Sequence, residues 1–175
     1  VAASTSVSAL DIASSQGAVK VDAVWTGLDQ PWAFGFLPDG SILVTERDGE
    51  LLHGSRNGGI TRVSGVPKVA SDGQGGLLDL LIPRDFASSR EIFMTYAKPH
   101  RRGAGTAVMR ANLSADGSAL SNVETIFELE AGSSGGRHFG SRVVEGADGY
   151  LYISIGDRGD RPSAQNLANE NGSIV

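Results

Sequence analysis

The sequence predicts an all-β fold made of about three four-stranded blades of a β-propeller. Three observations lead to this prediction. The 175 residues contain 24 glycines and few stretches that favour a helix, which is typical of a fold with many tight turns. An Asp-Gly turn, an apolar run and a small hydroxyl residue follow one another at 39–45 and again at 148–154. The hydroxyl residues Thr45, Thr95 and Ser154 lie about 50 to 60 residues apart, a spacing typical of propeller blades.

The first blade is predicted from its turns. Pro38 presets its own φ angle, Asp39 hydrogen-bonds back to the chain and Gly40 accepts a positive φ, so these residues favour a tight turn. Asp48 and Gly49 favour a second turn of the same kind. The strands expected around these turns are 21–25, 32–36, 42–46 and 51–53.

The second and third blades are predicted from further apolar runs. The strands expected in the second blade are 77–81, 92–96, 107–111 and 123–129. Strands at 141–145 and 150–155 open the third blade, and about twelve strands are expected in all. Residues 163–170 favour only a turn or two of helix, because glycine or proline interrupts every longer window. A β-sandwich is the competing architecture, and the repeated turn-and-strand pattern favours the propeller.

The N-terminal residues and the composition narrow the possible locations and partners of the protein. Residues 1–20 lack periodicity and are expected to form a loose arm, and their small polar residues without an initial Met indicate the mature end of a secreted protein. The chain has no cysteine, which excludes disulfides and thiolate chemistry. A net charge of −5 without a basic stripe argues against nucleic acid as a partner, and no apolar run approaches the roughly 18 residues of a membrane span.

The candidate site lies between residues 132 and 160. A loop rich in glycine and serine leads to His138, and Asp157 and Arg158 follow the strand expected at 150–155. A histidine on a loop that rigid strands support is a common arrangement for catalysis, because a neutral imidazole can accept a proton near pH 7. A surface histidine in an ordinary turn is the competing interpretation. The glycines around Gln74 indicate only a tight loop, since their spacing is not that of a dinucleotide cradle.

Four motifs in order carry a resemblance to a known family. They are LDQPWAFGFLPDGSILVTERDGEL at 28–51, VPKVASDGQGGLLDLLIPRDF at 66–86, RHFGSRVV at 137–144 and DGYLYISIGDRGDRPSAQNL at 148–167. Together they resemble the soluble PQQ-dependent aldose sugar dehydrogenases of the glucose/sorbosone dehydrogenase group. The resemblance implies a six-bladed β-propeller of roughly twice this length, so that residues 21–175 would form its N-terminal half. It also implies bound pyrroloquinoline quinone (PQQ) and calcium, and a periplasmic or secreted location.

The resemblance implies roles for three residues. His138 matches the family's catalytic base, which takes a proton from the anomeric hydroxyl while a hydride leaves C1 for the quinone. Gln74 is expected to hydrogen-bond the reacting hydroxyl of the sugar. Arg137 replaces an aspartate that precedes the histidine in the best-known soluble glucose dehydrogenase, so Arg137 is expected to contact substrate while a preference for glucose is not transferred.

The other polar residues near the site are expected to be structural. Arg142 is expected to pair with a carboxylate such as Asp157 and so to hold the loop. Asp157 and Asp160 could bind calcium through carboxylate oxygens, but they lack EF-hand spacing and are expected to serve as turn residues. The family's cofactor calcium is bound by a later segment, so no metal ligands and no cofactor ligands are assigned within this chain.

Two functions from different classes are compatible with these residues. The first is oxidation of aldose sugars at C1 to lactones, with PQQ as hydride acceptor and an external acceptor for the electrons. In that case the chain is only part of the enzyme and is expected to be inactive without the remaining propeller half or a complementary chain. The second is a non-catalytic β-propeller that binds a partner. The pair formed by His138 and Gln74 favours the enzyme.

Overall fold

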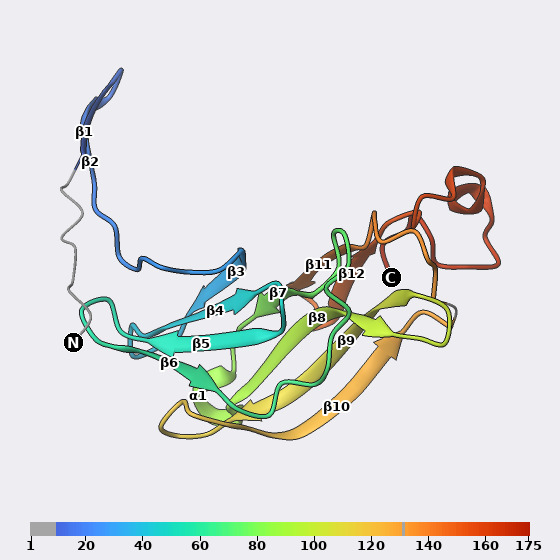
Figure 1. The fold of residues 1–175 in the computed structure, drawn as a ribbon. Coiled ribbons are helices and arrows are strands. Elements are labelled where there is room, and N and C mark those ends of the chain that lie inside the picture. The colour runs from blue at the N-terminus through green and yellow to red at the C-terminus, as the bar shows by residue number, and fades with distance from the viewer. Residues whose placement is uncertain (1–9, 131) are drawn as a thin grey trace.

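The computed structural model describes residues 10–130 and 132–175 and is dominated by antiparallel strands (Figure 1). The first four-stranded sheet comprises β3 (Pro31–Phe36), β4 (Ile42–Glu46), β5 (Glu50–Gly54) and β6 (Ile60–Val63). The second comprises β7 (Leu77–Leu81), β8 (Glu91–Pro99), β9 (Ala104–Leu113) and β10 (Leu120–Glu128). A two-stranded sheet follows, with β11 (Gly140–Glu145) and β12 (Leu151–Ile155).

Each four-stranded sheet is a meander in which consecutive strands are neighbours, and the first strand lies at one edge. These first strands are also where the sheets meet, because β7 packs against both β3 and β11. Meanders that pack side by side through their first strands are blades of a propeller. The predicted all-β propeller is therefore confirmed.

The third blade differs from the four strands expected of it. It has β11 and β12, and beside them only residues 173–175, which pair with β12. Ile153 and Val175 exchange backbone hydrogen bonds of 2.8 and 3.0 Å, and Ile155 N–H donates to Ser173 O at 2.8 Å. The described chain thus contributes two complete blades and part of a third.

Three local expectations in the blades need correction. Residues 22–30 form a loop where a strand was expected, because Trp25 packs on the Ile42–Val44 cluster and its indole N–H donates to Ser55 O at 3.1 Å. The strand β6 was not expected, since three of its four residues are exposed and give no alternation. Short helical turns occur at α1 (Phe86–Ser89) and η1 (Arg161–Gln165), the latter a 3₁₀ turn where one or two helical turns were expected.

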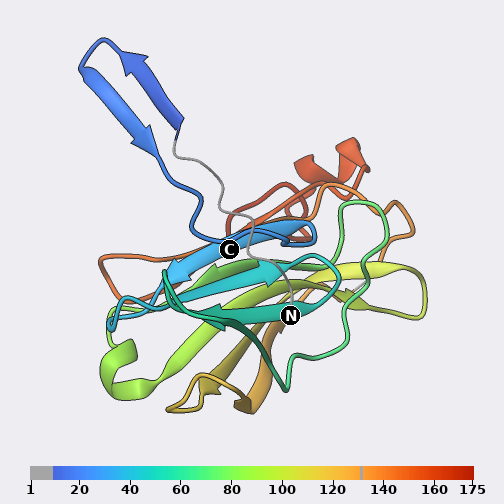
Figure 2. The same ribbon diagram turned by 60° about the vertical axis from the view of Figure 1, so that its left-hand side comes forward.

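The N-terminal segment also differs from the loose arm expected over residues 1–20. Residues 1–9 lie outside the described chain, but β1 (Leu10–Ser14) and β2 (Gly17–Val21) form a hairpin. The Ser14 hydroxyl donates to Gly17 O at 2.7 Å and stabilises the turn. Residues 11–21 are all exposed, and the hairpin projects away from the blades (Figures 1 and 2).

The hydroxyl residues that mark the sequence repeat connect one blade to the next. The Thr45 hydroxyl on β4 accepts Ala33 N–H at 3.0 Å within its own blade and donates to Leu78 O of the second blade at 2.7 Å. Thr95 on β8 accepts Asp79 N–H at 2.8 Å and donates to Ser141 O of the third blade at 2.8 Å. Both threonines are fully buried, at 0% exposure. The repeat therefore has a physical cause, because the same hydrogen bond fixes each pair of neighbouring blades.

Ser154 on β12 occupies the corresponding position in the third blade. Its hydroxyl accepts Arg142 N–H at 3.0 Å, as Thr45 and Thr95 do within their own blades. Within the part of the chain that the structure describes, no carbonyl of a following blade accepts from Ser154.

Replacing Thr95 by valine should destabilise the protein strongly while preserving side-chain volume. The substitution leaves Asp79 N–H and Ser141 C=O buried without a partner, and each such group costs about 1–3 kcal/mol. We expect urea unfolding to give a free energy lower by about 2 kcal/mol or more. Thr61→Val is the control, because the Thr61 hydroxyl bond to His53 O is exposed, and its effect should stay within about 0.5 kcal/mol. Equal stability of the two variants would contradict the role of Thr95 as a connector.

Candidate functional site

His138 lies on the loop between β10 and β11, immediately before the first strand of the third blade. Its backbone is in the left-handed region, with φ of 53°, a conformation that non-glycine residues adopt uncommonly. Its side chain is 48% exposed, so the imidazole is within reach of a ligand. Such a backbone persists only where the surroundings fix it, and the neighbouring contacts do so.

The loop of Gln74 joins the loop of His138 through two hydrogen bonds. His138 N–H donates to Gln74 Oε1 at 2.8 Å, and Gln74 N–H donates to Gly136 O at 2.7 Å. The two loops approach so closely that a Cβ at Gly73 would lie 2.2 Å from Gly136 O, which explains the glycine. The structure thus brings together the two predicted site residues, which are 64 positions apart in the sequence.

The carboxylate of Asp157 hydrogen-bonds the imidazole ring of His138 and so fixes its orientation. Asp157 Oδ1 lies 2.6 Å from His138 Nδ1 and also accepts Gly159 N–H at 2.8 Å. The hydrogen bond from Gly159, followed by that from His138, lowers the pKa of the Asp157 carboxyl. An ionised carboxylate only accepts, so the proton of neutral His138 lies on Nδ1 and the Nε2 lone pair is left to act as a base.

The expected partnership of Arg142 with Asp157 is wrong. Arg142 Nη1 donates to Asp79 Oδ1 at 2.9 Å, and Val143 N–H donates to Asp79 Oδ2 at 2.8 Å. Asp79 is only 3% exposed, so its carboxylate connects the first strands of the second and third blades. The structural role expected of Arg142 remains, whereas Asp157 is the partner of the candidate base and not merely a turn residue. The sequence contained one indication that Asp79 has a structural role, because it is a charged residue inside the otherwise apolar run of β7.

An open hollow of about 530 Å³ lies beside His138. Its lining consists of Arg137, His138, Gly159, Asp160, Arg161 and Pro162. The predicted substrate residue Arg137 is therefore next to the base, and Arg161 and Pro162 are lining residues that the sequence did not indicate. The lining thus offers two guanidinium groups, an imidazole and the carboxylate of Asp160, a set of donors and acceptors that suits a ligand with carboxylates or many hydroxyls. Among residues 10–130 and 132–175, no three His, Asp or Glu side chains gather as metal ligands would.

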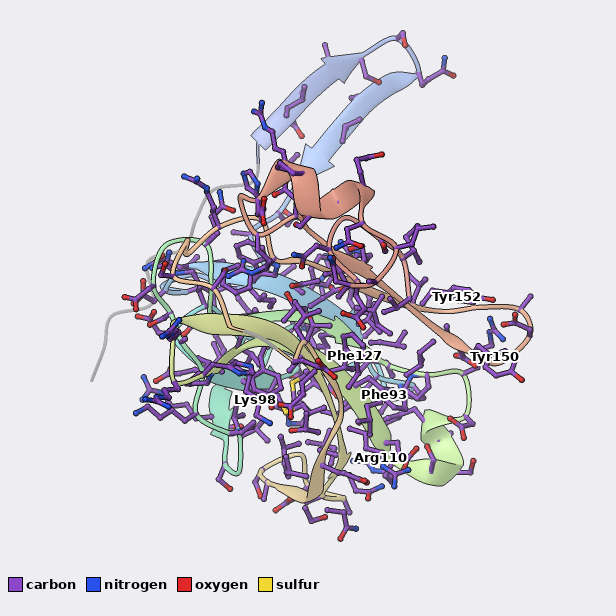
Figure 3. The ribbon with its side chains drawn as sticks, turned by 90° about the vertical axis from the view of Figure 1, so that its right-hand side faces the viewer. Phe93, Lys98, Arg110, Phe127, Tyr150 and Tyr152 are labelled. Carbon is purple, nitrogen blue, oxygen red and sulfur yellow. The ribbon has the colours of Figure 1, made fainter. Side chains whose placement is uncertain are left out.

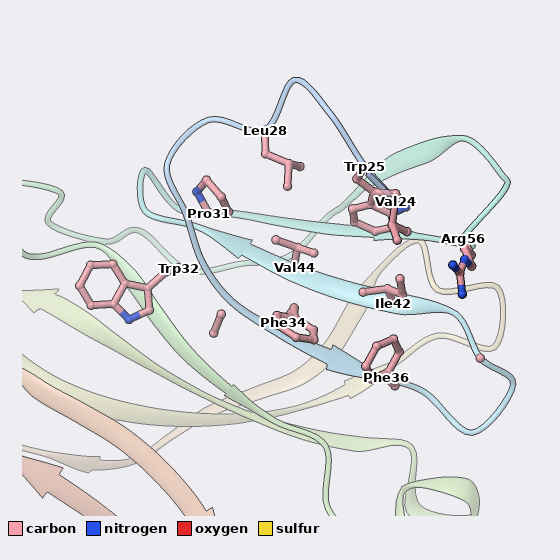
Figure 4. Close-up of a pocket in the computed structure, with 12 residues that line it drawn as sticks. Val24, Trp25, Leu28, Pro31, Trp32, Phe34, Phe36, Ile42, Val44 and Arg56 are labelled. Carbon is pink, nitrogen blue, oxygen red and sulfur yellow. The ribbon is translucent and has the colours of Figure 1, made fainter. Parts of the chain in front are cut away.

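A second and larger hollow, of about 810 Å³, lies over the open face of the first blade (Figure 4). It is lined by Trp32, Phe34, Phe36 and other apolar residues of β3, β4 and the loop before them. Arg56 is the only charged residue in its lining. This hollow therefore has no group that could carry out acid–base chemistry, and its aromatic residues are typical of a sheet face that another element covers.

Comparison with known proteins identifies relatives over nearly the whole chain. The model of the family described as "Glucose / Sorbosone dehydrogenase" matches residues 28–175. Aldose sugar dehydrogenase YliI of Escherichia coli (strain K12) is 43% identical over 160 residues, covering 90% of this chain and 43% of that protein. Quinoprotein glucose dehydrogenase B of Acinetobacter calcoaceticus is 30% identical over 149 residues, covering 78% of this chain and 30% of that protein.

Solved structures agree with these relatives. The apo form of the soluble aldose sugar dehydrogenase from Escherichia coli matches with a TM-score of 0.82 and 44% identity, over 85% of this chain and 44% of that one. The PQQ-bound aldose sugar dehydrogenase from Streptomyces coelicolor matches with a TM-score of 0.76 and 28% identity, over 87% and 45%. No helix among the described residues is long and apolar enough to cross a membrane. The chain spans less than half the length of these relatives, and it belongs to the glucose/sorbosone dehydrogenase family.

Proposed function

We propose that this chain is part of a PQQ-dependent aldose sugar dehydrogenase in which His138 is the general base. The observation that carries the proposal is the contact between His138 Nδ1 and Asp157 Oδ1 at 2.6 Å, beside an open hollow lined by Arg137, Asp160 and Arg161. This contact leaves Nε2 as the atom that accepts a proton. Membership of the family and the PQQ-bound relative support the cofactor.

The reaction that fits this site oxidises the sugar at C1 to a lactone. His138 Nε2 takes the proton of the anomeric hydroxyl, and C1 gives up its hydrogen with both bonding electrons as the C1–O bond becomes a carbonyl. Bound PQQ would supply a quinone as the acceptor of that hydride. Asp157 stabilises the imidazolium that forms on His138. Gln74 keeps the backbone of His138 in place through Oε1, and its amide nitrogen is proposed to hydrogen-bond the reacting hydroxyl of the sugar. An external acceptor then collects the electrons.

The residues of the hollow are compatible with PQQ, a planar quinone that carries three carboxylates. Arg137 and Arg161 offer guanidinium groups to such an anion or to the hydroxyls of the sugar, and we assign Arg137 to the sugar. The remaining contacts to PQQ and those to calcium are proposed to come from blades outside this chain. We also propose the periplasmic or secreted location that the resemblance to the family implies.

The remaining propeller half is the partner we propose for the open blade faces. On the first blade Trp32, Phe34 and Phe36 are 49%, 64% and 65% exposed, which is costly for a free surface. On the third blade Tyr150 and Tyr152 are exposed (Figure 3), and the Ser154 hydroxyl is positioned to donate to a following blade. A sixth and a fourth blade would cover these two faces.

A non-catalytic β-propeller that binds a partner is the second candidate. The apolar hollow over β3 and β4 is the observation that favours it. A binding module, however, has no use for an imidazole that is oriented by a carboxylate. Reduction of a dye by aldoses, with and without added PQQ and calcium, separates the two functions.

Replacing His138 by alanine in the full-length enzyme should abolish turnover. A general base contributes about 10²- to 10⁴-fold to rate, so kcat should fall at least by that factor. The fold should survive, because the half-exposed ring of His138 contributes little to the core. His53→Ala on β5 is the matched control, and its kcat should be that of the wild type. Near-normal turnover of His138→Ala would disprove the assignment of the base.

Replacing Gln74 by alanine should lower kcat/KM for sugars only moderately and leave PQQ affinity unchanged. The variant loses one hydrogen bond to His138 N–H, which is worth about 0.5–1.5 kcal/mol, or roughly a 2- to 13-fold effect. Steady-state kinetics and a PQQ titration measure the two quantities. A collapse of PQQ affinity would instead place Gln74 in the cofactor shell.

The 175 residues alone should neither bind PQQ nor oxidise sugars, because most of the proposed cofactor ligands lie on other blades. A dye-reduction assay with PQQ, calcium and several aldoses tests this, with the full-length protein as the positive control. Sugar-dependent activity of the 175-residue polypeptide by itself would show that the proposed division of ligands between the two halves is mistaken.

A further inference from the structure

Arg158 is a buried cation that the proposed reaction does not use. Only 5% of the residue is exposed, and it lies between β12 and η1 with a left-handed φ of 55°. No carboxylate of the described residues forms an ion pair with its guanidinium. Burial lowers its pKa to about 10, so the side chain remains charged at neutral pH. Burying a charge without a direct ion pair is costly, so the nearby carboxylate of Asp157 and further polar contacts must compensate it.

Arg158 contacts all three residues centred on His138, and two of these contacts involve its guanidinium group. Arg158 Nη1 donates to the carbonyl of Arg137, the residue before the candidate base. The backbone N–H of Arg158 donates to the carbonyl of His138 itself at 3.3 Å. The guanidinium carbon lies 3.4 Å from the ring centroid of Phe139, the residue after the base, in a cation–π contact.

These contacts tie the loop to the interior of the second blade. Arg158 Nη2 donates to Ala104 O on β9 at 3.2 Å, and Phe139 is 4% exposed in a cluster with Leu78 and Ala97. The Thr106 hydroxyl on β9 donates to Phe139 O at 2.8 Å. The side chain of Arg158 thus bridges β9 and the two residues that flank His138.

An arginine is not the residue that stability alone would favour at this place. An apolar side chain of similar length would fill the volume without the cost of a buried charge, and such replacements are often neutral or stabilising. What an apolar side chain cannot do is donate to two carbonyls of different segments while stacking on an aromatic ring. The contacts therefore favour a role in holding the His138 loop rather than in stabilising the fold.

We propose that Arg158 is a positioning residue that fixes the backbone of His138, so that Nδ1 meets Asp157 and Nε2 stays available to the substrate. The inference rests on the proposed function for its catalytic consequence, whereas the orientation of the imidazole can be measured without any cofactor. A base displaced by about 1 Å can lose about 10²-fold in rate, which sets the expected size of the effect.

The test compares Arg158→Met, Arg158→Lys and the control Arg62→Met in the full-length protein. Arg62 is an exposed arginine on β6 that pairs with Glu50 at 2.9 Å, so its replacement removes a cation without touching the site. In the PQQ-free protein, ¹⁵N NMR of the histidine rings, assigned with His138→Ala, reports the tautomer of His138. In the loaded enzyme, kcat and KM are measured, and thermal melting confirms that each variant is folded.

We expect Arg62→Met to retain the Nδ1–H tautomer of His138 and the wild-type kcat. Arg158→Met should show a mixture of tautomers and a kcat about 10²-fold lower with little change in KM. Arg158→Lys, which keeps the charge and a donor, should recover part of both signals and serves if the methionine variant does not fold. Wild-type ring signals and wild-type kcat in folded Arg158→Met would overturn the proposal, as would the same result in Arg158→Lys if the methionine variant does not fold. The two proposals can also fail separately. If Arg158→Met loses the single tautomer but the loaded wild-type protein oxidises no sugar, the positioning role is supported and the proposed function is disproved.

Discussion

The buried threonine hydroxyls between the blades are the interaction on which the site depends. Thr45 fixes the carbonyl of Leu78, and Gln74 lies four residues before Leu78. Thr95 in the same way fixes the carbonyl of Ser141, three residues after His138. The two loops can exchange hydrogen bonds only because the first strands that follow them are held at fixed positions. A connection between neighbouring blades therefore also determines the geometry of the candidate active site.

Different residues fix the backbone and the side chain of His138. Gln74 acts on the backbone of His138, and Asp157 acts on its ring. The carboxylate of Asp157 is kept ionised by the N–H of Gly159 and by the imidazole, as its lowered pKa indicates. This division allows the ring to stay half exposed, because its orientation does not depend on burial. An exposed but oriented base is what a site for polar substrates requires.

The sequence predicted best where apolar runs are bounded by turns. The predicted strands 42–46 and 77–81 agree with β4 and β7 at both ends, because their residues are almost all buried. Exposed elements were missed, as in β6 and the hairpin of β1 and β2, since no burial pattern marks them. The partners of Arg142 and Asp157 were mistaken because a loop residue's neighbours come from other blades, and sequence spacing does not contain that information.

The blades are connected one after another, so local unfolding should begin at the junctions between them. Each blade is fixed mainly to the one before and the one after it, so stability is approximately a sum of nearest-neighbour couplings, as in solenoid repeats. The second blade has two such couplings, while the partial third blade has one in the described chain. The loop of His138 lies at the junction of the second and third blades, so loosening of the contact between Thr95 and Ser141 should displace the candidate base before the strands of either blade separate.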